Sequence, residues 1–210
     1  MTVDILNGKA AYYHAPKCGS RTILGWITIL ETPEIFKKYP HWFKKTSIED
    51  PVYGEIRKRV KVLSSGIKIL NNYPVRFCVI RDPVERFISG YTNRIVFHKD
   101  LIKLKNPPGT ISDFIKNFDF YCDNDPSTKL HFSPQNVFYG TDLSLYTHIF
   151  KFKNFDKIKS LLQEISGTSL PDIHLQQSGS VQKPTLSNTE IEWVKEVYRE
   201  DYNLYKNYID

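Results

Sequence analysis

The sequence predicts an α/β fold in which helices cover both faces of a central parallel sheet, as a three-layer sandwich. Short buried-type strands alternate with helical segments, which is the pattern of parallel strands joined by crossover helices. The 210 residues, 40% of them hydrophobic, are enough for one sizeable core. Neither an internal repeat nor a linker rich in Gly, Pro or Ser divides the chain, so we expect a single domain over residues 1–210.

Three strand–helix pairs carry this prediction. Each strand is a short apolar or aromatic run such as "AAYYHA" or "VRFCVI", and each helix that follows repeats its apolar residues at helical spacing. The strands are expected at residues 10–15, 75–80 and 146–152, and the helices at residues 22–30, 81–97 and 154–165.

The remaining segments give a less regular pattern. Residues 31–60 are aromatic and basic without clear periodicity, and residues 98–110 are typical of a loop. Ser112 is expected to cap a short helix, "DFIKNF". Residues 186–209 predict one long closing helix. Its apolar stripe is Ile191, Val194, Val197, Tyr198 and Tyr202.

Charge and cysteine usage limit the class of protein. The net charge of +6 suits an anionic ligand, although solvated lysines produce such an excess equally often. Cys18, Cys78 and Cys122 are odd in number and widely spaced, so they predict neither a disulfide framework nor a metal site, and they indicate a reducing compartment. The chain starts without a signal pattern and has no membrane-length apolar run, so we expect a cytoplasmic protein.

The first polar cluster is "YHAPKCGSRT", where a strand turns at a proline just before a helix. It does not have the Walker spacing, because Lys17 precedes Gly19, the only glycine of this stretch. A strand–turn–helix still forms an anion site, because free N–H groups and the helix dipole point at the ligand. Gly19 allows close approach of the backbone, Ser20 and Thr22 offer hydroxyl groups, and Lys17 and Arg21 add positive charge.

Two alternatives stand beside this interpretation. The cluster is equally consistent with an ordinary helix start capped by Ser20 and preceded by a solvated Lys17. Cys18 is a candidate nucleophile by its position. A cysteine in such a loop is more often present only because its side chain is small, and no His or acid lies beside Cys18 in sequence.

The second cluster is "VIRDPVERFISGY". Asp82 as N-cap, Pro83 at the first helical position and Glu85 as the partner of a capping box have a purely structural explanation. Arg81 instead leaves the end of a buried strand, where an unpaired guanidinium is costly, so it needs an anion.

Ser89 lies two helical turns further along and can add a hydroxyl group to a phosphate site built on Arg81. The structural alternative is a salt bridge from Arg81 to a neighbouring acid, with Ser89 a packed small residue, and Arg86 is expected to be structural. Two anion sites at adjacent strand ends suggest one nucleotide that is phosphorylated on both its 5′ and 3′ sides.

These motifs resemble those of the sulfotransferases that use 3′-phosphoadenosine 5′-phosphosulfate (PAPS), in particular the carbohydrate (Golgi-type, family 2) branch. In that family P-K-x-G-x-[ST]-[ST] binds the 5′-phosphosulfate and R-D-P-x-x-R-x-x-S-x-Y binds the 3′-phosphate. "PKCGSRT" matches the first motif, with Arg21 where a hydroxyl residue is common, and "RDPVERFISGY" matches every specified position of the second. Four further segments show weaker similarity to the family: "GTISDFIKNF", "HFSPQ", "HIFKFKNFDKI" and "LSNTEIEWVKEVYREDYNLY". The third of these lacks the acidic residue that is usual near Lys153.

The resemblance implies a P-loop-like sulfotransferase fold and metal-free, in-line transfer of a sulfuryl group from PAPS to a hydroxyl group, with a carbohydrate as the expected acceptor. Lys17 is implied as the catalytic cation. The donor-binding residues implied are Lys17, Cys18, Gly19, Ser20, Arg21, Thr22, Arg81 and Ser89, with Lys183 closing over the nucleotide.

A hydroxyl acceptor also needs a base. Relatives often place one after the second strand, but "KVLSSGIKIL" has neither His nor acid. We expect His131, from "HFSPQ", to be the base, with His41 as the alternative, although a lone His is more often structural.

Two other functions remain open from the sequence. A nucleotide-dependent kinase or NTPase is disfavoured because the Walker spacing and an evident Mg²⁺-binding Asp are missing. A non-catalytic polyanion or RNA binder is supported only by the basic balance and the many aromatic residues, which follow predicted core faces rather than a stacking platform. We therefore expect no nucleic acid as partner, and no membrane segment.

Overall fold

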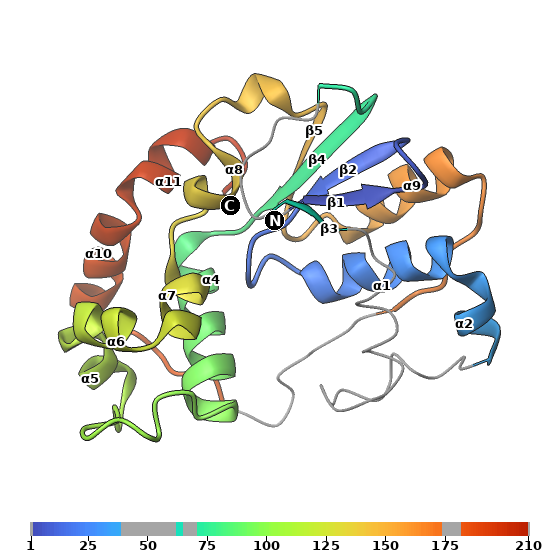
Figure 1. Ribbon diagram of the computed structural model, residues 1–210. Helices are drawn as coiled ribbons and strands as arrows, with labels where there is room; N and C mark the ends of the chain where they lie inside the picture. The colour runs from blue at the N-terminus through green and yellow to red at the C-terminus, as the bar shows by residue number, and fades with distance from the viewer. Residues whose placement is uncertain (1, 39–61, 65–70, 174–181, 210) are drawn as a thin grey trace. The chain divides into compact units, whose positions relative to one another are not determined.

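The structure is a computed structural model that describes residues 2–38, 62–64, 71–173 and 182–209 (Figure 1). The chain divides into two compact units. The sheet unit comprises Met1–Ile80 and Phe138–Gln177, and the helical unit comprises Arg81–Val137 and Ser178–Asp210. The prediction that the whole chain is one domain stays a prediction.

The sheet unit contains a five-stranded sheet of order β3-β1-β2-β4-β5. The three expected strands are present and parallel: β2 pairs with β4, and β4 with β5. Two strands that the sequence analysis did not predict, β1 and β3, make the sheet mixed, because β1 runs antiparallel to both β2 and β3. The bounds are Thr2–Ile5 (β1), Ala10–Tyr13 (β2), Val62–Ser64 (β3), Val75–Ile80 (β4) and His148–Lys151 (β5).

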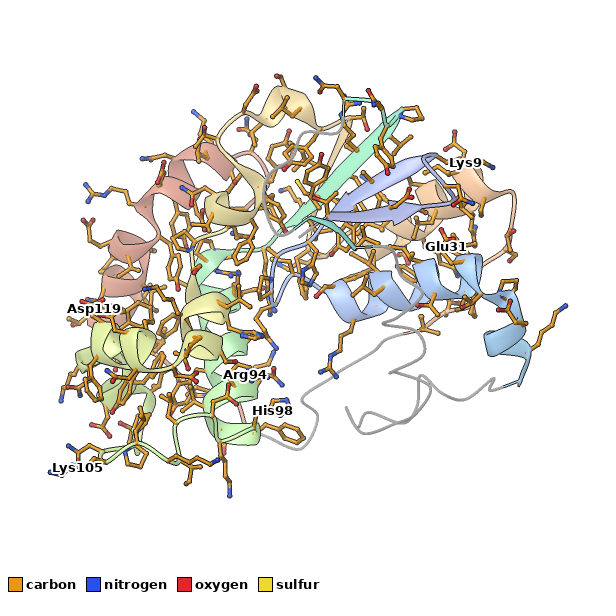
Figure 2. The ribbon with its side chains drawn as sticks, viewed as in Figure 1. Lys9, Glu31, Arg94, His98, Lys105 and Asp119 are labelled. Carbon is orange, nitrogen blue, oxygen red and sulfur yellow. The ribbon has the colours of Figure 1, made fainter. Side chains whose placement is uncertain are left out.

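The first hairpin explains why β1 escaped prediction. Strand β1 has only four residues and is joined to β2 by a tight turn. Leu6, Asn7 and Gly8 in this turn all have positive φ. Such a short strand gives no measurable alternation, so only the turn chemistry signals it. Glu31, at the end of α1 (Ser20–Glu31), accepts a hydrogen bond from the backbone N–H of Leu6, and Figure 2 labels Glu31 below this turn.

Helices α1 and α9 (Phe155–Ser166) are the helices expected after β2 and β5, and they contact one another beside the sheet (Figure 1). Ile23 and Ile27 of α1 are fully buried, as the apolar stripe predicts. The Trp26 indole N–H donates to the Pro171 carbonyl at 2.9 Å, which ties α1 to the segment after α9. A short α2 (Pro33–Lys38) follows α1.

Every described element that lies wholly in the helical unit is a helix. Its core is aromatic: the Phe87 and Phe132 ring centres lie 5.2 Å apart, and those of Phe114 and Phe132 lie 4.8 Å apart. The elements are α4 (Pro83–Gly90), the π-helix η2 (Tyr91–Phe97), α5 (Ile111–Lys116), α6 (Phe118–Asn124), α7 (Pro126–Phe132), α10 (Asn188–Val197) and α11 (Arg199–Tyr205). Two short helices, α8 (Asn136–Tyr139) and η3 (Leu143–Leu145), lie between α7 and β5.

Three local predictions are wrong. The N-cap of α5 is Thr110, whose side chain forms a capping box with Asp113, whereas Ser112 donates to Glu190 of α10. The expected closing helix is broken at Tyr198, where φ is −107° and ψ is 24°, into α10 and α11. Val197, the last residue of α10, is 37% exposed rather than part of the buried stripe, because it lies at the edge of the helix face that carries Ile191 and Val194.

The helix after β4 also departs from the prediction. It begins as α4 but continues as the π-helix η2, and the His98 N–H donates to the Asn93 carbonyl five residues back at 3.0 Å. Arg94, which Figure 2 labels in this segment, is held by Asp100 and Ser127. Within the described residues, no helix combines the length and the apolar composition that crossing a membrane requires.

Candidate active site

The lysine turn, residues 16–19, joins β2 to α1 in the sheet unit. Two of its residues have left-handed backbone conformations: φ is 68° at Lys17 and 74° at Gly19. A lysine in this region is strained by about 1 kcal/mol or more, and such strain is concentrated at functional sites. Left-handed residues within a turn also direct successive backbone N–H groups into one concavity, which is a common anion-binding geometry.

The first turn of α1 starts without a capping side chain. Its N-cap is Gly19, whose carbonyl accepts hydrogen bonds from the N–H groups of Thr22 at 3.1 Å and Ile23 at 3.4 Å. The proposal that Ser20 caps this helix is therefore wrong, since Ser20 is its first helical residue. The first turn also has no acidic residue, so the positive end of the helix dipole is not neutralised within its own turn.

Gly19 is required at its position for two independent reasons. Its φ disfavours any side chain, and an added Cβ atom would lie 2.3 Å from Cζ and 2.8 Å from Cε1 of the Phe155 ring. Helix α9 therefore packs directly against the turn, and the close approach fixes where α1 begins.

We expect Gly19→Ala to lower the stability of the sheet unit by more than the roughly 1 kcal/mol that the left-handed conformation alone costs. The matched control is Gly167→Ala, because Gly167 has a φ of 68° but no described atom within 4 Å of an added Cβ. Thermal unfolding of both variants separates clash from backbone strain. Equal losses of stability would contradict the packing role of Phe155.

The Cys18 side chain points into the interior of the sheet unit. It is fully buried, near Tyr139, whose hydroxyl donates to the Val79 carbonyl at 2.8 Å. Burial, together with the neighbouring Cys18, raises the pKa of Tyr139 well above its usual value. A thiol with no exposed surface is not placed to attack an external substrate, so any ligand contact of Cys18 would come from its backbone N–H.

The other residues of the first motif differ in exposure. Lys17, Ser20 and Arg21 are partly exposed, whereas Thr22 is 5% exposed. The turn thus presents two cations and one hydroxyl group beside an uncapped helix start, all within the sheet unit. This composition is suited to a doubly or triply charged oxyanion.

The arginine turn, residues 81–83, opens the helical unit. Asp82 is the N-cap of α4, and its Oδ1 accepts from the Glu85 N–H at 2.9 Å, with Pro83 at the helix start as predicted. The Glu85 carboxylate instead faces Arg81, with 3.6 Å between Oε2 and the Arg81 Nε. The expected alternative of an arginine–acid pair is therefore present, but it is long and the Glu85 side chain is 48% exposed, so it contributes little to stability.

Arg86 and Ser89 lie further along α4. Arg86 is 2% exposed and donates to the His131 carbonyl at 3.3 Å, a bond that fits the structural role expected for it. Ser89 is partly exposed and lies one turn beyond Glu85, and hence in the same helical column as the acid that faces Arg81.

The expected base, His131, lies on α7. Its Nδ1 is 2.8 Å from the Ser127 carbonyl, and since a carbonyl only accepts, Nδ1 carries the proton of the neutral ring and Nε2 is the basic nitrogen. Lys183 is exposed in a segment without regular structure. The alternative base, His41, lies outside the described residues.

Two buried polar residues, Gln135 and Asp201, were missed by the sequence analysis, and both are fully buried in the helical unit. Asp201 did leave a signal, because it falls in register with the buried stripe positions Val194, Tyr198 and Tyr205. An acid at a core position requires buried hydrogen-bond partners. Among the described residues, no group of three or more His, Cys, Asp or Glu is arranged to hold a metal ion.

Comparison with known proteins identifies the class of the enzyme. The sequence model of the sulfotransferase family matches residues 7–208, nearly the whole chain and both motifs. The chain therefore belongs to the sulfotransferase family, and it is a transferase of sulfuryl groups. No curated protein and no solved structure gives a significant match.

Proposed function

We propose that this protein transfers the sulfuryl group of PAPS to a hydroxyl group of a carbohydrate, as in the Golgi-type branch of the family. The observation that carries the proposal is the start of α1, which follows a strained Lys17 and has neither a capping side chain nor an acid in its first turn. A helix start without an acid in its first turn keeps the positive end of its dipole un-neutralised there, which favours an anionic ligand.

Residues 17–22 are assigned to the 5′-phosphosulfate. The backbone N–H groups of the turn and the hydroxyl groups of Ser20 and Thr22 would bind its oxygens, and Arg21 would add charge. Lys17 would stabilise the negative charge that develops on the bridging oxygen as the sulfuryl group departs. The left-handed backbone of Gly19 suits such a backbone contact to the donor, while the place of its missing Cβ is taken by the Phe155 ring.

Arg81 and Ser89 are assigned to the 3′-phosphate of the donor. The match to the complete motif supports this assignment. Strands β2 and β4 are parallel neighbours, with Tyr13 paired to Cys78, and each motif follows the carboxyl end of one of these strands. Open α/β sheets bind ligands at this edge. Lys183 remains a proposed further contact.

The acceptor side of the proposal depends on His131. With the proton on Nδ1, Nε2 is the nitrogen of the neutral ring that would take the hydroxyl proton. We also propose that helices cover both faces of the sheet, that the protein works in a reducing compartment, and that the reaction requires no metal.

Transfer of ³⁵S-labelled sulfuryl from PAPS, in excess EDTA, tests the proposal against a panel of sugars, phenols, lipids and peptides. We expect labelled product with a carbohydrate acceptor. Product only from another acceptor class would overturn the carbohydrate assignment alone. Transfer that requires added Mg²⁺, or phosphoryl transfer from ATP in its place, would overturn the mechanism.

A further inference from the structure

The backbone of Arg81 is held by a side chain rather than by the sheet. Strand β4 ends at Ile80, whose carbonyl accepts the last ladder hydrogen bond, from the Phe152 N–H at 2.8 Å. One residue on, the Arg81 N–H donates to Gln135 Oε1 at 3.0 Å, and Gln135 Nε2 donates to the Arg81 carbonyl at 2.9 Å. The Gln135 amide thus pairs with both peptide groups of Arg81, as a neighbouring strand would.

Gln135 is in turn held by Asp201 of α11. The two carboxylate oxygens accept from the backbone N–H groups of Gln135 at 2.7 Å and Asn136 at 3.0 Å. The second hydrogen of Gln135 Nε2 points at the same carboxylate, 3.5 Å away. Burial raises the pKa of Asp201, while these backbone N–H groups and the Arg86 guanidinium act in the opposite direction.

The next residue of α11 holds the next residue of the arginine turn. The Tyr202 hydroxyl donates to Asp82 Oδ2 at 2.9 Å, while Asp82 Oδ1 caps α4. Two consecutive residues of α11 therefore hold the arginine turn from more than a hundred positions away in sequence: Asp201 acts on Arg81 through Gln135, and Tyr202 bonds directly to Asp82.

The arrangement is more than is needed to satisfy buried groups. A water molecule or a capping hydroxyl would satisfy either peptide group of Arg81, whereas one amide that pairs with both sets the direction in which the Arg81 side chain leaves the backbone. Direction matters for a guanidinium, because its bidentate bonds to a phosphate are planar and tolerate little misalignment.

We propose that Gln135 and Asp201 are positioning residues for the 3′-phosphate of the nucleotide, acting through the backbone of Arg81. The inference rests on the proposed function, since it takes Arg81 as the phosphate-binding group. It also assigns a role to Gln135 in "HFSPQ", a segment in which the sequence had drawn attention to the histidine.

The test compares two ligands that differ only in the 3′-phosphate, 3′,5′-diphosphoadenosine and adenosine 5′-monophosphate, by isothermal titration. Both substitutions, Gln135→Met and Asp201→Asn, keep the size of the side chain. Gln135→Met removes the pairing with the Arg81 backbone, and Asp201→Asn removes one of the two carboxylate acceptors that hold Gln135 and Asn136. We expect each variant to lose about ten-fold in affinity for the diphosphate while its affinity for the monophosphate is unchanged. In an Arg81→Ala background neither substitution should lower the affinity further.

Tyr198→Phe is the matched control, because the Tyr198 hydroxyl is a buried donor to the Phe132 carbonyl at 2.6 Å in the same unit but has no bond to Arg81. It should lose stability without changing the ratio of the two affinities. If Gln135→Met or Asp201→Asn folds and keeps the wild-type ratio, the positioning role is overturned and the proposed function stands. If the wild-type protein itself does not distinguish the two ligands, the proposed function fails, and this inference with it.

Discussion

Replacing Lys17 by alanine is expected to lower kcat for sulfuryl transfer by about a thousand-fold, the cost of removing a positioned donor from a developing oxyanion. Affinity for 3′,5′-diphosphoadenosine should stay within about three-fold of wild type, because the helix start and Arg81 remain. Single-turnover rates and titration with the diphosphate measure the two quantities separately.

Lys9→Ala is the control for the loss of one positive charge, since Lys9 is an exposed lysine of the same unit in the turn before β2 (Figure 2). Both its kcat and its affinity should be unchanged. A Lys17→Ala variant that binds the diphosphate poorly but turns over bound donor at the normal rate would make Lys17 a binding residue only, contrary to its assigned role.

Replacing Arg81 by alanine is expected to weaken binding of 3′,5′-diphosphoadenosine by about ten- to a hundred-fold, the range for hydrogen bonds to charged groups. Binding of adenosine 5′-monophosphate should hardly change, because it carries no 3′-phosphate. The contact to half-exposed Glu85 is long and contributes little to folding, so its loss alone should hardly change the unfolding temperature.

Arg199→Ala serves as the control for Arg81, because Arg199 is a surface arginine of the same unit, 69% exposed and paired with Glu196. It should leave both affinities unaltered. An Arg81→Ala variant with unchanged affinity for the diphosphate and reduced stability would show that Arg81 serves the Glu85 pair rather than the nucleotide.

Strong local signals account for the parts of the fold that the sequence predicted. The runs that became β2 and β4 are apolar on both faces, which is typical of interior parallel strands, and the cap at Asp82 follows from residue chemistry alone. The break at Tyr198 was not predictable in this way. Residues on both sides of it have good helical patterning, and the break is associated with tertiary bonds made by Tyr198 and Asp201.

The candidate site shows the same division. The charged and hydroxyl residues of the lysine turn were identified from composition and spacing, because anion binding near a helix start depends on local backbone geometry. The absence of a Ser20 cap could not be read from the sequence, since Ser20 and Gly19 are both acceptable N-cap residues. Gln135 was missed because its partners, Arg81 and Asp201, are more than fifty residues away on either side.

The central claim is that the protein binds an adenosine nucleotide through both its 5′ and 3′ phosphates without a divalent ion. Thermal unfolding in excess EDTA, with and without 3′,5′-diphosphoadenosine, tests it most directly. We predict a rise in melting temperature with the diphosphate that exceeds the rise with adenosine 5′-monophosphate, and little response to ATP with Mg²⁺. A stronger response to ATP with Mg²⁺, or none to the diphosphate, would contradict the claim.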